Sequence, residues 1–187
     1  MLTRSTVRLL VAGTLLVAVA AVAAVASEDS RSFRVRDDCD PATFNAAIGP
    51  GTCNERFDGD TTFQKFINEL TEDKSVGAWR FNPDQTGLDR GQKTIIESRG
   101  GEFHTFTRVA DFGGGIVPVL NTLAGAGATR PECGTPGVLA PPKGTNQFVP
   151  AGAAFPGPTA GSTDLPTGTT KWQCCIHPWM RSTITVK

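Results

Sequence analysis

Apolar and polar positions follow three different patterns along the chain. Residues 9–25 form an almost uninterrupted apolar run, residues 40–74 hold apolar positions at helical spacing, and from residue 76 short stretches alternate apolar and polar side chains. These patterns are typical of a targeting segment, of amphipathic helices and of half-buried strands, respectively. We therefore divide the chain into a leader at residues 1–26, an N-terminal extension at 27–75 and a main domain at 76–187.

The leader is predicted to be a signal peptide. Arg4 and Arg8 precede the apolar run, and the segment "AVA" at 24–26 has small residues where a signal peptidase cleaves. The mature chain is then expected to begin at Ser27 in an exported, oxidising compartment, either periplasmic or extracellular. An uncleaved membrane anchor is the alternative, because the 17 residues of the run reach the lower limit for a span.

The extension is expected to begin with a flexible polar lead-in at 27–38, followed by a short helix. Asp40 is suited to cap this helix, with Pro41 in the first helical position. Cys39 and Cys53 flank the helix, and we expect them to form a disulfide in an oxidising compartment. Two unpaired thiols are the alternative.

A second helix is predicted within residues 58–74, capped by Asp60 or Thr61. Its apolar side chains recur at the spacing of one helix face, which favours packing against a core over any ligand role. The members of this stripe are Phe63, Phe66, Ile67 and Leu70.

The main domain is predicted to be all-β. Short alternating stretches are separated by turns, as in a sandwich or barrel. Residues 84–91 are interpreted as a turn, and 123–168 as a long irregular excursion rich in glycine and proline. The predicted strands lie at 77–83, 92–99, 102–109, 146–150, 167–174 and 182–187.

Composition narrows the function further. Eighteen basic and eighteen acidic residues give a formal net charge of zero, so nothing suggests nucleic acid as a partner. Five cysteines leave one thiol unpaired if the others form disulfides. The chain has two histidines, which is too few for a copper oxidase or nitrite-reductase-like enzyme whose sites need several. We therefore do not expect an enzyme.

The segment "QCCIHPWM" at 173–180 places three ligand types in the spacing C-x-x-H-x-x-M. Cys174, His177 and Met180 can approach one point if the chain turns after a strand. His104 is the remaining histidine. A thiolate, two imidazoles and a weak axial methionine form the ligand set that selects copper for electron transfer. Zinc is disfavoured by the methionine.

Strand alternation suggests which cysteine is the ligand. Trp172 and Cys174 share one face, which should be the core, whereas Gln173 and Cys175 should point outward. Cys175 could then pair with Cys133. The alternatives are a structural disulfide that uses Cys174, or a catalytic cysteine–histidine pair, for which the methionine has no role.

Two segments of the main domain resemble those of a known protein family. The segments "CCIHPWM" and "GGEFHTFT" resemble the ligand segments of the cupredoxins, or blue-copper proteins, in their amicyanin-like form. The resemblance covers about residues 76–187. It implies an all-β, Greek-key β-sandwich with a helical N-terminal extension and one type 1 copper. His104, Cys174 and His177 would be the equatorial ligands and Met180 the axial ligand.

The function implied is that of a one-electron carrier for an unidentified redox partner protein. His177 is expected to be the exposed edge through which electrons pass, and the 123–168 stretch could reshape the approach of partners. A copper storage or delivery protein of the cell envelope is the alternative. A membrane tether is expected only if the leader is not cleaved.

Overall fold

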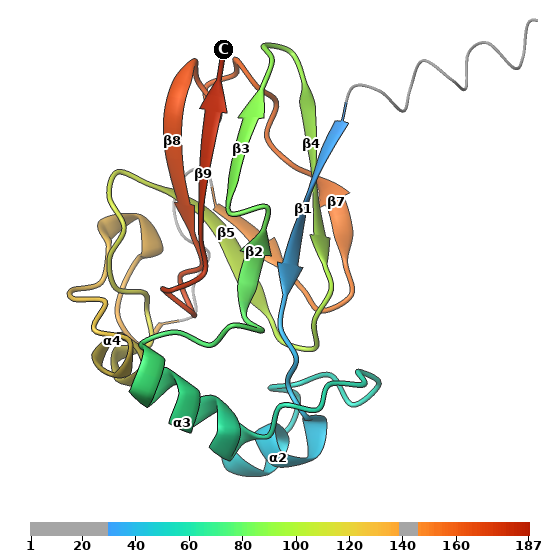
Figure 1. Cartoon of the computed structure of the whole chain (residues 1–187), viewed down its shortest axis with the longest axis vertical. Helices are drawn as coiled ribbons and strands as arrows, with labels where there is room; N and C mark the ends of the chain where they lie inside the picture. Colours follow the sequence, from blue (N-terminus) through green and yellow to red (C-terminus); the bar gives the residue numbers. More distant parts are fainter. Residues whose placement is uncertain (1–29, 139–145) are drawn as a thin grey trace, which may run out of the picture. The chain divides into compact units, whose positions relative to one another are not determined.

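Two β-sheets form the body of the chain in the computed structural model, which describes residues 30–138 and 146–187 (Figure 1). The predicted signal peptide lies outside these residues. The first sheet has the order β2 (Arg80–Asn82), β1 (Ser30–Arg36), β4 (Lys93–Ser98), β7 (Ala154–Pro156). The second has the order β3 (Gln85–Leu88), β9 (Arg181–Val186), β8 (Gly168–Gln173), β5 (His104–Val109), β6 (Asn146–Val149). The prediction of an all-β sandwich is thus confirmed.

Aromatic rings fill the space between the two sheets. The Phe106 ring stacks on Trp172 at 4.7 Å within the second sheet. Phe33 of β1 and Phe81 of β2 reach the same ring from the first sheet, at 5.5 and 5.0 Å between centroids. All four side chains are buried. Burial of such large apolar surfaces is the main force that holds the sheets together.

The register of the second sheet places two distant segments at one end. β8 pairs antiparallel with β5, with Thr107 opposite Gln173, and antiparallel with β9. The start of β5 and the end of β8 therefore lie together. The connection from β8 to β9, residues 174–180, is called the ligand loop below. His104 and the ligand loop consequently meet at the same end of the sandwich.

The flexible lead-in expected at 27–38 is wrong for residues 30–36, which form β1 between β2 and β4. Phe33 and Val35 are buried, whereas Arg34 and Arg36 are exposed. This alternation is the ordinary strand period, and it outweighs the polar composition. Two further strands, β3 and β7, lie where a turn and an irregular stretch were expected.

Two helices of the extension cover the ligand-loop end, α2 (Pro41–Ala47) and α3 (Phe63–Asp73). The Asp40 carboxylate caps α2, as predicted, whereas Thr62 caps α3 in place of the expected Asp60 or Thr61. Thr61 instead donates its hydroxyl to Asp38. The predicted apolar stripe is confirmed, because Phe66 and Leu70 are buried and the other two members pack against them.

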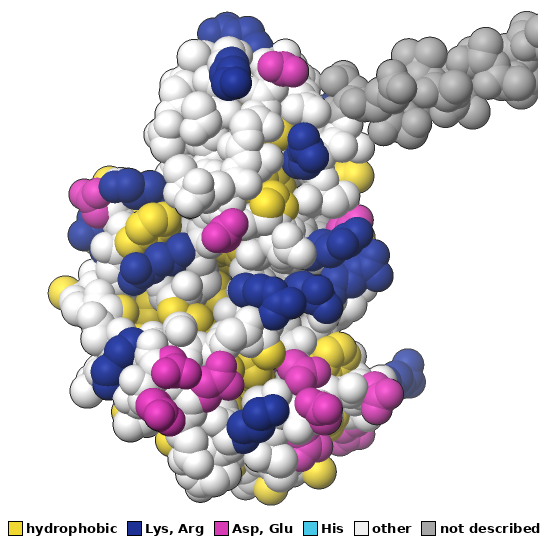
Figure 2. Space-filling view, viewed as in Figure 1, with side chains coloured by type: hydrophobic (Ala, Val, Ile, Leu, Met, Phe, Trp, Pro, Cys, Tyr) yellow, Lys and Arg dark blue, Asp and Glu magenta, His cyan; other side chains and the backbone are white. Residues whose placement is uncertain are grey.

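The remaining helices lie between β5 and β6: α4 (Pro118–Leu123) and a 3₁₀ turn (Pro131–Cys133). None of the helices in the described part of the chain has the length and apolar character that a membrane crossing needs. Charge is unevenly distributed in the space-filling view: Lys and Arg gather over β1 and β2, and Asp and Glu gather over α3 and its neighbouring loop (Figure 2).

Two disulfides are present: Cys39–Cys53, which was expected, and Cys133–Cys175, which was one of the possibilities left open. Cys174 is free and buried. In the chain-entropy picture, bridges that close 14 and 42 residues stabilise the fold by about 3 and 4 kcal/mol. Two disulfides suggest an oxidising, extracytoplasmic location.

Candidate metal centre

Three buried side chains with metal-ligating atoms meet at the end of the sandwich. His104 is the first residue of β5, and Cys174 and His177 lie on the ligand loop. They come together because β5 and β8 are paired neighbours, although 70 residues separate His104 from Cys174. The structure thus brings together three of the four residues predicted from the sequence as ligands.

The separations of the three donor atoms suit one metal ion. Cys174 Sγ lies 3.8 Å from Nδ1 of His104 and 3.9 Å from Nδ1 of His177, and the two nitrogens are 3.3 Å apart. A trigonal first-row metal with bonds of about 2.0–2.3 Å holds neighbouring ligand atoms about 3.5–4.0 Å apart. The triangle therefore fits a single ion bound by one thiolate and two imidazoles.

Each histidine turns its other ring nitrogen to a buried carboxylate. His104 Nε2–H donates to Asp37 at 2.6 Å, and both side chains are fully buried. His177 Nε2 lies 3.4 Å from Glu102, which is also buried. Such partners fix the tautomer and the ring orientation, so that Nδ1 is left to bind a metal. Both histidines are held ready for the same centre.

Backbone amides hold the Asp37 carboxylate in place. It accepts hydrogen bonds from the N–H groups of Gly101 at 2.8 Å and Glu102 at 3.2 Å. A Cβ atom at Gly100 would collide with this carboxylate, so the close approach requires glycine there. Burial opposes ionisation of Asp37, but its hydrogen bond to His104 and these amides outweigh burial and lower its pKa. Asp37 is therefore the ionised partner of His104.

The Cys174 sulfur is surrounded by donors. The backbone N–H groups of Thr105, Ile176 and His177 each lie 3.4 Å from it. Burial disfavours a thiolate, yet the two histidines stabilise it and hold the pKa of Cys174 well below its ordinary value. Burial likewise opposes the charged form of His104, but Asp37 and Cys174 raise its pKa to about 10. The side chains alone thus favour a thiolate next to an imidazolium.

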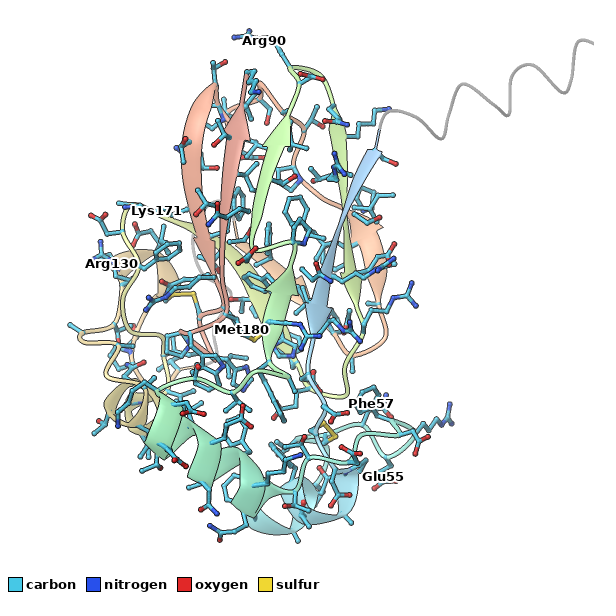
Figure 3. The ribbon with its side chains drawn as sticks, viewed as in Figure 1. Glu55, Phe57, Arg90, Arg130, Lys171 and Met180 are labelled. Carbon is cyan, nitrogen blue, oxygen red and sulfur yellow. A yellow bond between two sulfur atoms is a disulfide. The ribbon has the colours of Figure 1, made fainter. Side chains whose placement is uncertain are left out.

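Met180 closes the ligand loop. The Cys174 N–H donates to the Met180 carbonyl at 3.0 Å, and the Met180 N–H donates to the His177 backbone carbonyl at 2.9 Å. Met180 is 1% exposed and lies at the end of the sandwich that faces α3 (Figure 3). These two bonds return the chain to the cluster. Ligation by the Met180 sulfur remains a prediction.

Cys175 does not point to solvent, contrary to expectation. It pairs with Cys133, the partner that the sequence left open, and Cys175 and Gln173 are both fully buried. The segment after β5 covers this face: Gly113 N–H donates to the Gln173 side chain at 3.1 Å, and Ile116 N–H donates to the Cys175 carbonyl at 2.6 Å. Trp172 and Cys174 thus share one face and Gln173 and Cys175 the other, as predicted, but both faces are buried in the protein.

His177 is not the exposed edge that the sequence suggested. It is 3% exposed, because aromatic rings from α3 and from the ligand loop itself cover it. Phe66 of α3 and Trp179 lie 6.3 and 5.4 Å from its ring, and Phe66 also contacts Trp79 at 4.8 Å. The helix predicted simply as a core element therefore seals the metal centre from solvent.

Asp37 and Glu102 were not predicted as site residues. Asp37 lies within the stretch interpreted as a flexible lead-in, and Glu102 precedes β5 in an ordinary polar position. A carboxylate two residues before His104 is a weak signal that could have identified Glu102. Nothing in the sequence near Asp37 points to a histidine 67 residues away.

No protein-family model matches the chain, and no curated protein matches it. Solved structures similar to it include a purple cupredoxin from Nitrosopumilus maritimus, at 11% identity, with a TM-score of 0.40, covering 83% of this chain and 98% of that one. A mutant plastocyanin of fern matches at 15% identity, TM-score 0.38, covering 84% and 100%.

Amicyanin from Paracoccus versutus is similar over 60% of this chain and 77% of its own, at 14% identity and a TM-score of 0.33. These identities and TM-scores are too low to assign a function to the chain.

Proposed function

We propose that the protein is an exported, cupredoxin-like one-electron carrier that holds a single type 1 copper ion. The observation that supports this most directly is the triangle of Cys174 Sγ and two histidine Nδ1 atoms, all buried, with side lengths of 3.3–3.9 Å. One thiolate and two imidazoles, with a methionine beside them, are the donor set of copper electron-transfer sites.

The residues of the chain have distinct roles in this proposal. Cys174, His104 and His177 would hold copper, with Met180 as the axial ligand, and bound copper would supply the one-electron couple. Asp37 would fix the His104 ring, and the three amides around Cys174 would fix the thiolate. Because these groups are already oriented, the site needs little rearrangement when its charge changes.

A carrier is favoured over an enzyme by the histidine count. Both histidines of the chain belong to the one cluster, so this chain has no imidazole left for a second copper site. Burial of Cys174 and His177 also disfavours a store or delivery protein, since metal exchange between proteins needs ligands that a partner can reach. The partner proposed here is instead a redox protein, and no nucleic acid is expected.

Adding Cu(II) to the purified protein and recording visible and EPR spectra tests the proposal. We expect one copper per chain, with an intense visible band from the thiolate. Cys174→Ser should abolish the band, whereas Met180→Leu, the matched ligand-loop variant, should shift it and retain it. A colourless complex that binds Cu(I) exchangeably would favour storage or delivery, and colour that survives Cys174→Ser would refute the type 1 site.

A further inference from the structure

A hollow in the surface reaches the ligand loop from the side of β2. It has a volume of about 500 Å³, and Trp79, Trp179 and Met180 are among the residues that line it. Two arginines, Arg80 and Arg181, and one acidic residue, Asp84, also line it. Helix α3 covers the face over His177. At the hollow, by contrast, Trp179 and Met180 of the ligand loop lie next to the surface.

A chain of contacts connects the wall of the hollow to the candidate ligand. The Trp79 indole N–H donates to Glu102 Oε2 at 2.5 Å, and the same oxygen lies 3.4 Å from His177 Nε2. One carboxylate therefore bridges an aromatic ring of the wall and an imidazole of the centre. The path from the hollow to His177 passes through buried side chains that are already in contact.

Arginines gather next to the hollow in an arrangement that costs stability. Arg36 and Arg80 are directly opposite each other on β1 and β2, and both are exposed. Like charges at directly opposite positions destabilise a sheet. Among the described residues, no carboxylate lies within ion-pair distance of either one. With Arg34 and Arg99 they form a basic surface, called the arginine strip.

Two basic side chains on the far side of the second sheet are paired with carboxylates. Lys171 pairs with Asp111 at 2.6 Å, and Arg130 lies 3.9 Å from Glu132. In the arginine strip the one carboxylate, Glu97, contacts Arg99 and Arg34, on the side away from the hollow. Arg36 and Arg80, beside the hollow, therefore keep a charge that no carboxylate of the described residues compensates.

Acidic side chains surround the neighbouring α3 surface (Figure 2). They would repel an anion that approached over the covered face of His177, and the arginine strip would attract it to the hollow. The acidic group consists of Glu55, Asp58, Asp60, Glu69, Glu72 and Asp73.

We propose that a redox protein with an acidic docking face binds over the arginine strip and exchanges one electron with the centre through the hollow, by way of Trp79 and Glu102. The inference rests on the proposed copper function for the electron, but the docking surface is defined by side chains that do not bind metal. An acidic partner is favoured because, within residues 30–138 and 146–187, Arg36 and Arg80 have no counter-charge of their own.

NMR with hexacyanochromate(III), a paramagnetic and redox-inert trianion, tests the surface on the isotope-labelled protein as purified. We expect signal broadening at Arg36, Arg80 and the Trp79 indole, and little at α3. The double variant R36E/R80E should weaken anion binding at least tenfold. R31E/R90E makes the same charge change at the far ends of β1 and the sandwich, and should weaken it less than twofold.

Oxidation of the copper(I) protein by hexacyanoferrate(III) tests electron exchange, because one electron passes from copper(I) to iron(III). At low ionic strength R36E/R80E should slow this reaction about tenfold or more, the difference should vanish at high salt, and R31E/R90E should react at the normal rate. Broadening elsewhere, or unchanged rates in R36E/R80E, would overturn the docking surface.

The NMR and oxidation experiments together distinguish failure of the proposed copper function from failure of the proposed docking surface. If the protein binds no copper, the NMR arm still decides the docking surface while the proposed function fails. If the type 1 spectrum is present and R36E/R80E changes neither arm, the docking surface alone is refuted.

Discussion

A buried carboxylate oxygen of Asp37 lies 2.6 Å from Nε2 of His104, and neither side chain is exposed. Asp37 directly follows β1, the first strand of the described chain, whereas His104 begins β5 in the other sheet. The contact therefore connects the two layers of the sandwich at the metal centre. It gives the N-terminal strand a direct effect on the chemistry of the site.

Replacing Asp37 by Asn should raise the reduction potential of the copper protein. The amide keeps an acceptor for His104 Nε2–H, but the buried negative charge of the carboxylate is lost. Because that charge stabilises the oxidised ion, its loss raises the reduction potential. We expect a rise of about 60 mV, a tenfold shift of the redox equilibrium, measured by spectroelectrochemistry. The exposed Asp58→Asn should shift the potential by much less. A lower potential in Asp37→Asn would contradict this account.

Copper binding to the metal-free protein should release one proton near neutral pH. The pKa of His104 is raised to about 10, so its proton must leave, whereas the low pKa of Cys174 means that its proton has already left. The apparent affinity should rise about tenfold per pH unit from pH 6 to 9. Calorimetry in buffers of different ionisation enthalpy counts the protons. A release of two would show that Cys174 is a neutral thiol.

The cover over His177 should stabilise the whole fold. Phe66→Ala removes a ring that contacts Trp79, Trp179 and His177. We expect the free energy of unfolding to fall by about 3–5 kcal/mol, measured by urea denaturation. Asn68→Ala, on the exposed side of α3, should change it by about 0.5 kcal/mol or less. Equal effects of the two variants would show that α3 does not seal the centre.

Removing the Cys39–Cys53 disulfide should affect the centre as well as stability. Cys39 is two residues from Asp37, and the bridge packs against Gly101, whose amide binds the Asp37 carboxylate. The double change to Ala should cost about 3 kcal/mol and broaden the visible band. Thr52→Ala, in the same loop, serves as the control. If the double variant is destabilised but its visible band is normal, the disulfide does not position Asp37.

Short-range patterns in the sequence predicted much of this structure. Strand alternation around Trp172 identified Cys174 as the buried thiol, and the histidine count led to His104. The Asp40 cap and the Phe66 stripe predicted the two helices. Each of these signals depends on residues a few positions apart, or on residue types that occur rarely in the chain.

What the sequence did not reveal depends on contacts between distant segments. Asp37 meets His104 across 67 residues, and Glu102 meets Trp79 across 23. The exposure of His177 depended on where α3 docks, which no local pattern specifies. The outward face of β8 was polar in pattern, yet the segment at Gly113 covers it by hydrogen bonding to Gln173. In each case a tertiary contact overrode a local preference.

The span of the Asp37–His104–Cys174 arrangement has a consequence for how the protein is made. A strand near the beginning, a histidine near the middle and a loop near the end of the chain must all be in place before the three side chains can meet. Such long-range pairings form late and slowly. The candidate site is therefore completed only after β1, β5 and β9 have docked, so metal uptake would report on an assembled sandwich.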